Sequence, residues 1–326
     1  MKRMKLILIT ILGCLLMSTA CQLEFTPELD LEEKTILYGL FNHHDSKHYV
    51  RISRSFVRQV SGDTLTAPTF HPDSLEVWLE VYRFNQRVGY PIVMVPELLT
   101  KEPGMFKREN QLVYSAEVKL IGDSECRILV LNKQSGESIS SSCNLFSLQE
   151  FKPMFLSNMS RMEFYSLPDV YFYEVTCEFS YVEVTETDTS FQSLTYPVGI
   201  IFNGSKEPDL IMSISLNRPD WLNFLVQNIP VRPDVTRYAL ARPLEYKLLV
   251  GDQYLYDYRR SFSGKETVFH TGQSISNIQG GLGIFTAFDK LTLFSLPMLP
   301  HWYDKLANYP ETKDLNFINY PWGWKN

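Results

Sequence analysis

Four side chains of the types that bind transition metals lie close together early in the chain: His43, His44, Asp45 and His48. Imidazole nitrogens and carboxylate oxygens are ligands for zinc and similar ions. In an extended chain, however, the adjacent His43 and His44 would point to opposite sides. In addition, no Cys or Glu follows at a spacing typical of a zinc site. We therefore predict a solvated hairpin loop here, with no metal and no other cofactor.

The signatures of the common hydrolases are absent from the sequence, which contains no Gly-x-Ser-x-Gly, His-Glu-x-x-His or Ser-x-x-Lys segment. Glu174 and Glu178 form a pair of carboxylates on one side of a predicted strand. The rise of a strand separates them by about 13 Å, which is too far for the two carboxylates of a glycosidase. We therefore predict no catalytic residues and no enzyme activity.

Gly280, Gly281 and Gly283 form a glycine-rich stretch that invites comparison with a phosphate-binding loop. Such a loop needs a strand before it and a helix N-terminus after it. Here the aromatic and extended residues 284–288 follow instead. We predict a tight turn or bulge packed against aromatic side chains.

Three of the five cysteines lie beyond the N-terminal segment. Cys126 and Cys143 flank a predicted hairpin loop centred near 135–136, which places Cys143 opposite Ile128 and makes Cys126 its diagonal neighbour. A diagonal separation of about 7 Å is marginal for a disulfide. A Cys126–Cys143 disulfide is therefore a candidate. A different register of the two strands would change the distance between the two cysteines. Cys177 lies on the apolar face of a long predicted strand, where we expect a buried free thiol.

The tail at 297–326 combines prolines with large aromatic side chains, among them Trp302, Tyr303, Trp322 and Trp324. Aromatic faces can stack on sugar rings or on a partner chain, so these four residues are a candidate surface for a glycan or peptide ligand. The alternative, which we favour, is a tail that packs back over the second domain. Proline at this density argues against long regular elements.

The N-terminal segment has the three parts of a secretory signal. Three basic residues precede an apolar run from Leu6 to Met17, and the small residues 18–20 follow. The run is shorter than the roughly 20 apolar residues that a membrane-spanning helix needs. We therefore predict a signal peptide at residues 1–20.

Cys21, directly after Ala20, resembles the lipobox cysteine of bacterial lipoproteins, whose thiol is acylated before the signal is cut just ahead of it. The resemblance implies that Cys21 carries a lipid anchor of fatty-acyl chains such as palmitate. Several chains hold a protein stably on a membrane, whereas one does so only marginally. Ser18 stands where lipoboxes most often have Leu. An earlier match at Ile11-Leu12-Gly13-Cys14 would make Cys14 the lipidated residue, but it leaves only about seven apolar residues before it, fewer than a usual signal has. The other alternative is a plain secretory signal cut near Ala20.

The charge balance narrows the range of partners. The full chain has 31 Lys and Arg against 37 Asp and Glu, a net charge of −6. All three charged residues of the signal peptide are basic, so the mature chain is more acidic still. This balance argues against nucleic acid and against a polybasic membrane-binding patch. Aromatic residues make up 13% of the chain, and aromatic enrichment favours β-strands.

Short apolar runs with a period of two dominate the chain and predict a mostly β protein with few short helices. Before residue 150 the predicted strands are 34–41, 47–56, 75–84, 88–95, 112–120, 126–132 and 138–145. Seven short strands at this spacing predict an antiparallel β-sandwich of the immunoglobulin or transthyretin-like type.

The pattern pauses around 151–153, where we place a domain boundary. The elements predicted beyond it are strands at 170–184, 196–202, 210–216, 244–250 and 291–294 and helices at 219–227 and 252–260. The predicted organisation is a signal peptide at 1–20, an acidic tether at 21–33, an N-terminal sandwich at 34–150 and a second antiparallel β-sandwich-like domain at 151–326.

Two segments resemble a family of Bacteroidota lipoproteins. One is Ser276–Phe285, which reads Ser-Asn-Ile-Gln-Gly-Gly-Leu-Gly-Ile-Phe, and the other is Val50–Phe56. The family is catalogued as a domain of unknown function and is often encoded beside TonB-dependent transporters. The resemblance implies a lipid-anchored protein of the cell envelope at the outer membrane, without telling which face it occupies. It also implies a transporter as a partner and transfers no catalytic residues.

These observations lead to one functional hypothesis and two alternatives. The hypothesis is a binding or assembly component of the envelope, accessory to an outer-membrane transporter, and a shallow surface lined by the C-terminal tryptophans would favour it. A hydrolase or metal-dependent enzyme on the same anchor would instead show a buried cluster of His or carboxylate groups in a cleft. A structural adhesin or filament subunit would expose a donor strand at Ile36–Phe41.

Overall fold

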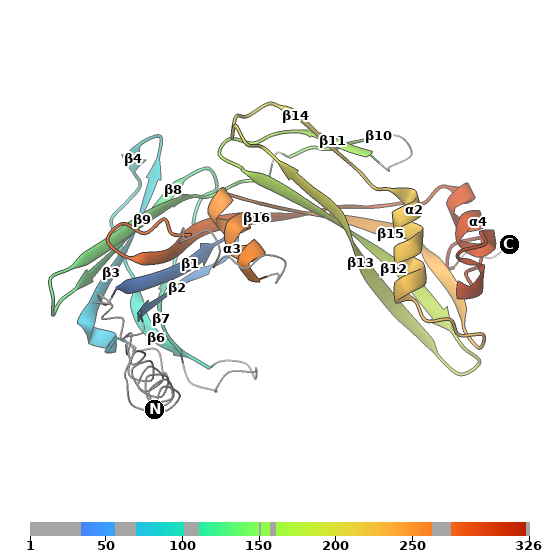
Figure 1. The fold of residues 1–326 in the computed structure, drawn as a ribbon, viewed down its shortest axis with the longest axis horizontal. Helices are drawn as coiled ribbons and strands as arrows, with labels where there is room; N and C mark the ends of the chain where they lie inside the picture. The colour runs from blue at the N-terminus through green and yellow to red at the C-terminus, as the bar shows by residue number, and fades with distance from the viewer. Residues whose placement is uncertain are drawn as a thin grey trace, which may run out of the picture.

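The computed structural model describes residues 34–55, 70–100, 111–149, 151–156, 161–262 and 275–323. Within these residues the chain is mostly β-strand with a few short helices, which confirms the predicted fold class. The strands form two lobes that lie side by side (Figure 1). The signal peptide, the tether and Cys21 lie outside the described residues, so their assignments stay predictions. None of the described helices is long and apolar enough to cross a bilayer.

The first lobe is a sandwich of two β-sheets. One sheet contains β1 (Thr35–Phe41), β2 (Lys47–Arg54), β6 (Val95–Leu99), β7 (Gln111–Glu117) and the start of β16 (Leu282–Leu296). The other contains β3 (Leu75–Arg83), β4 (Gln86–Arg87), β5 (Ile92–Val93), β8 (Glu125–Asn132) and β9 (Ser138–Asn144), and a 3-10 turn (Pro72–Ser74) precedes β3. Buried and partly exposed residues alternate along β3, as a strand with one core-facing side requires.

The second lobe is built on long antiparallel strands. β12 (Phe172–Val184) lies between β13 (Thr189–Phe202) and β15 (Thr236–Gly251), and the end of β16 pairs with β15. The predicted faces of β12 are confirmed, because every second residue from Tyr173 to Phe179 is buried while the residues in between are only partly so.

Two groups of elements cover the buried face of β12. Near its start lies a small sheet of β10 (Met154–Leu156), β11 (Arg161–Tyr165) and β14 (Ile211–Ser215). Its Phe164 ring packs 5.0 Å from the ring of Tyr173. Further along β12 the helix α2 (Arg218–Asn228) places Trp221 5.4 Å from Phe179. The remaining helices are α3 (Gln253–Phe262), α4 (Pro300–Asn308) and a 3-10 turn (Lys313–Leu315).

Strand β16 belongs to both lobes (Figure 1). Its residues 282–287 pair in parallel with β1, and its residues 288–296 pair antiparallel with β15. The predicted division into 34–150 and 151–326 therefore needs a correction, since a segment from the C-terminal part of the chain completes the first sandwich. The reason is that the alternating pattern of a segment predicts a strand but does not tell which distant strand pairs with it. The β1–β16 pairing is also parallel, an exception to the predicted antiparallel sheets.

Several predicted elements are too short. The predictions at 196–202, 244–250 and 291–294 correspond to the longer strands β13, β15 and β16. The first residues of β13 are mostly exposed and polar and give no alternating signal. Pro243 interrupts the pattern of β15, where the register with β12 shifts. The helix α4 was missed in the proline-rich tail because Pro300 stands in its first turn, the position at which a helix tolerates proline.

The glycine-rich stretch leads into β16 through a turn, as predicted. Gly280 has a φ of +74° and Gly283 a φ of +112°. A Cβ atom on Gly283 would lie 1.9 Å from the carbonyl oxygen of Leu37 in β1. Glycine is therefore required here for the close approach of the two backbones.

Candidate functional site

The turn between β1 and β2 brings two imidazole rings together. The side chain of Asn42 accepts a hydrogen bond from the backbone N–H of His44 at 2.9 Å, which bends the chain immediately after β1. The rings of His43 and His44 lie 3.9 Å apart between centroids. The expectation that they point apart is wrong because the pair lies in a turn and not in an extended segment. The expectation of a solvated loop is also wrong for His43, which is only 6% exposed.

A carboxylate from the far end of the sequence completes the cluster. Asp289, in the middle of β16, is fully buried. Its carboxylate oxygens lie 3.3 Å from Nε2 of His44 and 3.9 Å from Nδ1 of His43. One candidate ligand atom from each of the three residues lies within 4.8 Å of the others. Two backbone N–H groups, of Leu148 and Lys290, donate to the Asp289 carboxylate at 2.8 and 2.7 Å and fix its orientation.

His43 is an unusual buried side chain. Neither of its ring nitrogens has a hydrogen-bond partner of ordinary geometry within the described part of the chain. Burial lowers the pKa of His43, with Asp289 acting in the opposite direction, so the neutral imidazole with a free lone pair is favoured. A neutral imidazole is the form that binds metal ions.

The cluster opens onto a cleft of about 590 Å³ in the first lobe. Among the residues that line it are His43, His44, Arg83, Lys119 and Asp123. His44 is 52% exposed, whereas Asp289 is buried, so the group has one side toward solvent and one toward the core. Two imidazoles and a carboxylate form a donor set that suits zinc and similar transition-metal ions.

The other two residues of the sequence motif do not join this cluster. His48 is buried, and its Nε2 lies 3.1 Å from the carbonyl oxygen of Val118. Asp45 is exposed in the turn. The residue that sequence analysis missed is Asp289, whose distance along the chain hides it from any spacing rule. The only local sign of a special role is that Asp289 is a charged residue in the mostly aromatic and apolar strand β16.

Cys126 and Cys143 lie directly opposite each other on β8 and β9. The predicted diagonal relation was wrong by two residues of register, since Ile128 pairs with Ser141. Both side chains are buried free thiols, so the candidate disulfide is not formed in this structure. Burial raises the pKa of Cys126 to about 12 and also raises that of Cys143. Cys177 is a buried free thiol, as predicted.

Within the described residues, the C-terminal aromatic side chains do not form an open platform. Trp302 and Tyr303 are 7% and 5% exposed, and Trp302 packs 5.5 Å from Trp221 of α2. Trp322 is partly exposed against Tyr238, and Trp324 lies outside the described residues. The predicted ligand surface is therefore corrected for Trp302 and Tyr303, and the alternative of a packed tail is confirmed for them.

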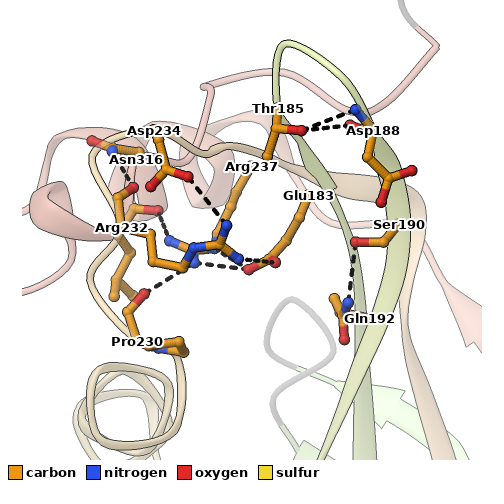
Figure 2. A network of polar contacts seen from close by, with 11 residues as sticks. Glu183, Thr185, Asp188, Ser190, Gln192, Pro230, Arg232, Asp234, Arg237 and Asn316 are labelled. Atoms are coloured by element: carbon orange, nitrogen blue, oxygen red, sulfur yellow. Dashed lines mark hydrogen bonds and ion pairs between the residues drawn. The ribbon is translucent and has the colours of Figure 1, made fainter.

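A buried arginine holds this tail in place (Figure 2). The guanidinium of Arg237 in β15 donates to Glu183, to the carbonyl of Pro230 and to the carbonyl of Leu315. The backbone N–H of Arg237 also donates to Asn316 at 2.9 Å. The network links β12 and β15 to the tail. It explains how this proline-rich segment, which has few regular elements, is held against the second lobe.

The carboxylate pair Glu174 and Glu178 has a structural explanation. Glu174 forms an ion pair with Arg259, and Glu178 forms one with Lys247. Each carboxylate thus has its own cation on the partly exposed face of β12, and the two do not act on one substrate atom.

Comparisons with known proteins add little to this geometry. A scan against protein-family models and a search of curated proteins gave no match. Among solved structures, the chain aligns with the C-terminal globular domain of an oligosaccharyltransferase from Pyrococcus abyssi, with 8% sequence identity and a TM-score of 0.16. The alignment covers 82% of this chain and 50% of that one, so the chain spans about half the length of that protein. A likeness this weak carries no argument about function.

Proposed function

We propose that the protein is a lipid-anchored binding component of the cell envelope that contacts an outer-membrane transporter. The anchor is Cys21, and the contact surface is the segment of residues 84–98 at the edge of the first lobe, called the edge segment below. The observation that carries the proposal is the large number of apolar side chains that this segment exposes. Those more than 40% exposed are Phe84, Val88, Tyr90, Val93, Val95 and Leu98.

The edge segment is ordered although its apolar side chains face outward. Val93 pairs with Trp78 of β3, and Met94 is buried in the core with its N–H bonded to the carbonyl of Val77. An ordered run of exposed apolar groups is typical of a protein contact surface, whereas single exposed apolar residues are common everywhere.

Phe84 is the clearest member of the segment. It lies at a φ of +50° in the turn after β3 and is 86% exposed. Positive φ at a hairpin turn favours Asn, Asp or Gly, and a bulky residue there is strained. The turn itself therefore does not call for Phe at this position, and a contact with a partner would give the ring a role.

The edge segment also ends at a sheet edge. β6 is the last strand of its eight-stranded sheet within the described residues, and Val95 and Leu98 on it are exposed. Edge strands offer unpaired backbone groups and are frequent sites of contact between proteins. Aromatic side chains such as Tyr90, which is 90% exposed, are enriched in the core of such interfaces.

The experiment compares Phe84→Ser/Tyr90→Ser with the wild-type chain by cross-linking in intact cells and capture from solubilised outer membrane. Phe191→Ser is the matched control, because Phe191 is 70% exposed on the other lobe. We expect a transporter to be captured by the wild type and the control, and recovery to fall at least tenfold with the double variant. Equal recovery with the double variant, or no transporter with the wild type, contradicts the proposal.

The anchor is tested separately with Cys21→Ala. We expect this variant to leave the detergent-soluble membrane fraction and to be recovered as a soluble protein, because it loses the acyl chains that hold it. The matched control is Cys14→Ala, which leaves the proposed lipidation residue in place. Continued membrane partitioning of the Cys21 variant contradicts the lipid anchor.

The two alternative functions differ in the observations that support them. A donor-strand adhesin requires a free strand at Ile36–Phe41, but β1 lies inside its sheet between β2 and β16, so that hypothesis is not supported. A metal-dependent protein on the same anchor is the second candidate. It would contain a cluster of His and carboxylate groups beside a cleft, and His43, His44 and Asp289 form such a cluster.

A further inference from the structure

We propose that His43, His44 and Asp289 form a binding site for one divalent transition-metal ion, with Zn²⁺ as the best match. The site goes beyond the proposed contact with a transporter and does not depend on it. It joins the turn after β1 to the middle of β16, two segments that lie side by side in the fold and far apart in the sequence.

The spacing of the candidate ligand atoms supports coordination. Zinc binds His nitrogen and carboxylate oxygen at about 2.1 Å, so two ligands of a tetrahedral site lie about 3.4 Å apart. Nε2 of His44 lies 3.3 Å from one oxygen of Asp289, and Nδ1 of His43 lies 3.9 Å from the other. One ligand atom from each residue lies within 4.8 Å of the other two, so the set is close to this spacing and must contract on binding.

An ion pair alone explains only part of the arrangement. A contact between His44 and Asp289 would leave both nitrogens of the buried His43 without a hydrogen bond of ordinary geometry, as they are now. A buried polar group without a partner is rare in folded proteins and calls for an explanation. A metal ion that takes a lone pair from each imidazole and one from the carboxylate gives one nitrogen of His43 a partner and uses all three residues.

The surroundings of Asp289 match those of a metal ligand. Metal-binding carboxylates are usually held in place by hydrogen bonds from a second layer of groups. Here the backbone N–H groups of Leu148 and Lys290 donate to Asp289 and orient it toward the histidines. The carboxylate is therefore fixed by the fold before any ion arrives.

Three protein ligands leave one tetrahedral position for water or for a bound molecule. His44 is half exposed and lines the cleft, so this position has a route to solvent. Lys119, Arg83 and one carboxylate, Asp123, line the same cleft, so its charged lining residues carry a net positive charge. The class of molecule that fits the fourth position is thus a small anionic group such as a carboxylate or phosphate.

The donor types also limit which ions fit. Imidazole suits zinc, copper, nickel and cobalt, whereas calcium and magnesium prefer sites made of oxygen ligands. Two of the three ligand atoms here are nitrogens. We therefore expect Zn²⁺ and Co²⁺ to bind and Mg²⁺ and Ca²⁺ to bind at least a hundredfold more weakly.

The experiment uses the full chain in detergent, produced without a polyhistidine tag and freed of metal with a chelator. Zn²⁺ is titrated by calorimetry, and Co²⁺ is followed by its visible absorption, which reports tetrahedral geometry. We expect one equivalent to bind and the melting temperature to rise with metal concentration, because an ion that binds only the folded state stabilises it.

Two variants and one control make the test specific. His44→Gln changes a half-exposed ligand, and Asp289→Asn keeps the shape of a buried one and one of the two oxygens that accept backbone hydrogen bonds. His71→Gln is the control, because His71 is 74% exposed and lies outside the cluster. We expect His71→Gln to bind Zn²⁺ like the wild type, and His44→Gln to lose at least tenfold in affinity with an unchanged metal-free melting temperature. Asp289→Asn should also lose at least tenfold.

Two results would overturn the proposal. One is a wild-type chain that takes up less than one equivalent of Zn²⁺ or binds it no more tightly than Mg²⁺. The other is a folded His44→Gln variant that binds Zn²⁺ as tightly as the wild type, which would place the ion elsewhere on the chain. Because His44 is half exposed, this variant is expected to fold and keeps the test decisive even if Asp289→Asn does not fold.

Discussion

Replacing Arg237 by Met should destabilise the second lobe and release the C-terminal tail (Figure 2). Arg237 is fully buried, and its guanidinium donates hydrogen bonds to Glu183 and to the backbone carbonyls of Pro230 and Leu315. Met has a similar length and fills the space with an apolar group. The substitution therefore removes charge and hydrogen bonds with little change in volume.

The expected cost follows from the groups left behind. Removing one partner of a buried ion pair costs about 3–5 kcal/mol, because the remaining charge is uncompensated. The two freed carbonyls add to this cost, at about 1–3 kcal/mol for each buried group left without a partner. Arg232 remains 3.6 Å from Glu183 and compensates in part. We expect a net loss of at least about 4 kcal/mol, a large share of the 5–15 kcal/mol that stabilise a typical domain.

The assay is urea unfolding followed by tryptophan fluorescence, because Trp221 is buried in the second lobe and packs against Trp302, which is buried in the tail. Limited proteolysis gives a second readout, since a protease should cut a released tail at a site after α4. Arg232→Met is the matched control. Arg232 is 44% exposed, and loss of an exposed ion pair costs at most about 1 kcal/mol.

A double variant separates this explanation from simple loss of packing. Replacing Glu183 by Leu together with Arg237→Met removes both charges, and such replacements recover stability relative to a broken pair. We expect the double variant to be more stable than Arg237→Met alone. If Arg237→Met loses less than about 1 kcal/mol, or the double variant is less stable than the single one, the buried ion pair does not hold the tail.

Two further predictions concern the backbone contact of β16 and the buried thiols. Gly283→Ala should cost more than about 2 kcal/mol in the free energy of unfolding, because its Cβ would meet a carbonyl of β1 at positive φ. Gly204→Ala, where nothing lies within 4 Å of the added atom, should change stability by less than about 1 kcal/mol, and equal effects of the two substitutions in thermal unfolding would refute this explanation. Cys126 and Cys143 should react with iodoacetamide at pH 8 only after unfolding, because burial keeps both as thiols with a raised pKa. Labelling of the folded chain, or a cross-linked 126–143 peptide in mass spectra without reduction, would contradict their description as inaccessible free thiols.

Local pattern was enough to predict the strands whose two faces differ. β3 and β12 alternate between buried and partly exposed residues, and the same alternation is visible in their sequences. Where one face carries no apolar signal, as in the first half of β13, the predicted strand began too late. The fold class follows from the first kind of strand, and the errors in strand length follow from the second.

The candidate metal site could not be predicted from the sequence for two physical reasons. The direction of a side chain depends on backbone torsions, and the turn held by Asn42 places His43 and His44 together where an extended chain would separate them. The third ligand, Asp289, is brought in by the pairing of β16 with β1, a contact between opposite ends of the chain. A rule based on ligand spacing finds sites formed by one segment and misses a site divided between two.

The position of Asp289 connects the site to the arrangement of the lobes. Ala287 still pairs with Phe41 of β1, whereas Phe288 already pairs with Gly251 of β15. Asp289 thus lies where β16 passes from the first sheet to the second. An ion bound by His43, His44 and Asp289 would fasten the turn after β1 to this crossing point and so restrict movement of one lobe against the other. The close approach at Gly283 fixes the same strand a few residues earlier, and pairing with β15 fixes it from Phe288 to Leu296. The fold thus holds β16 on both sides of the site before a metal adds its own constraint.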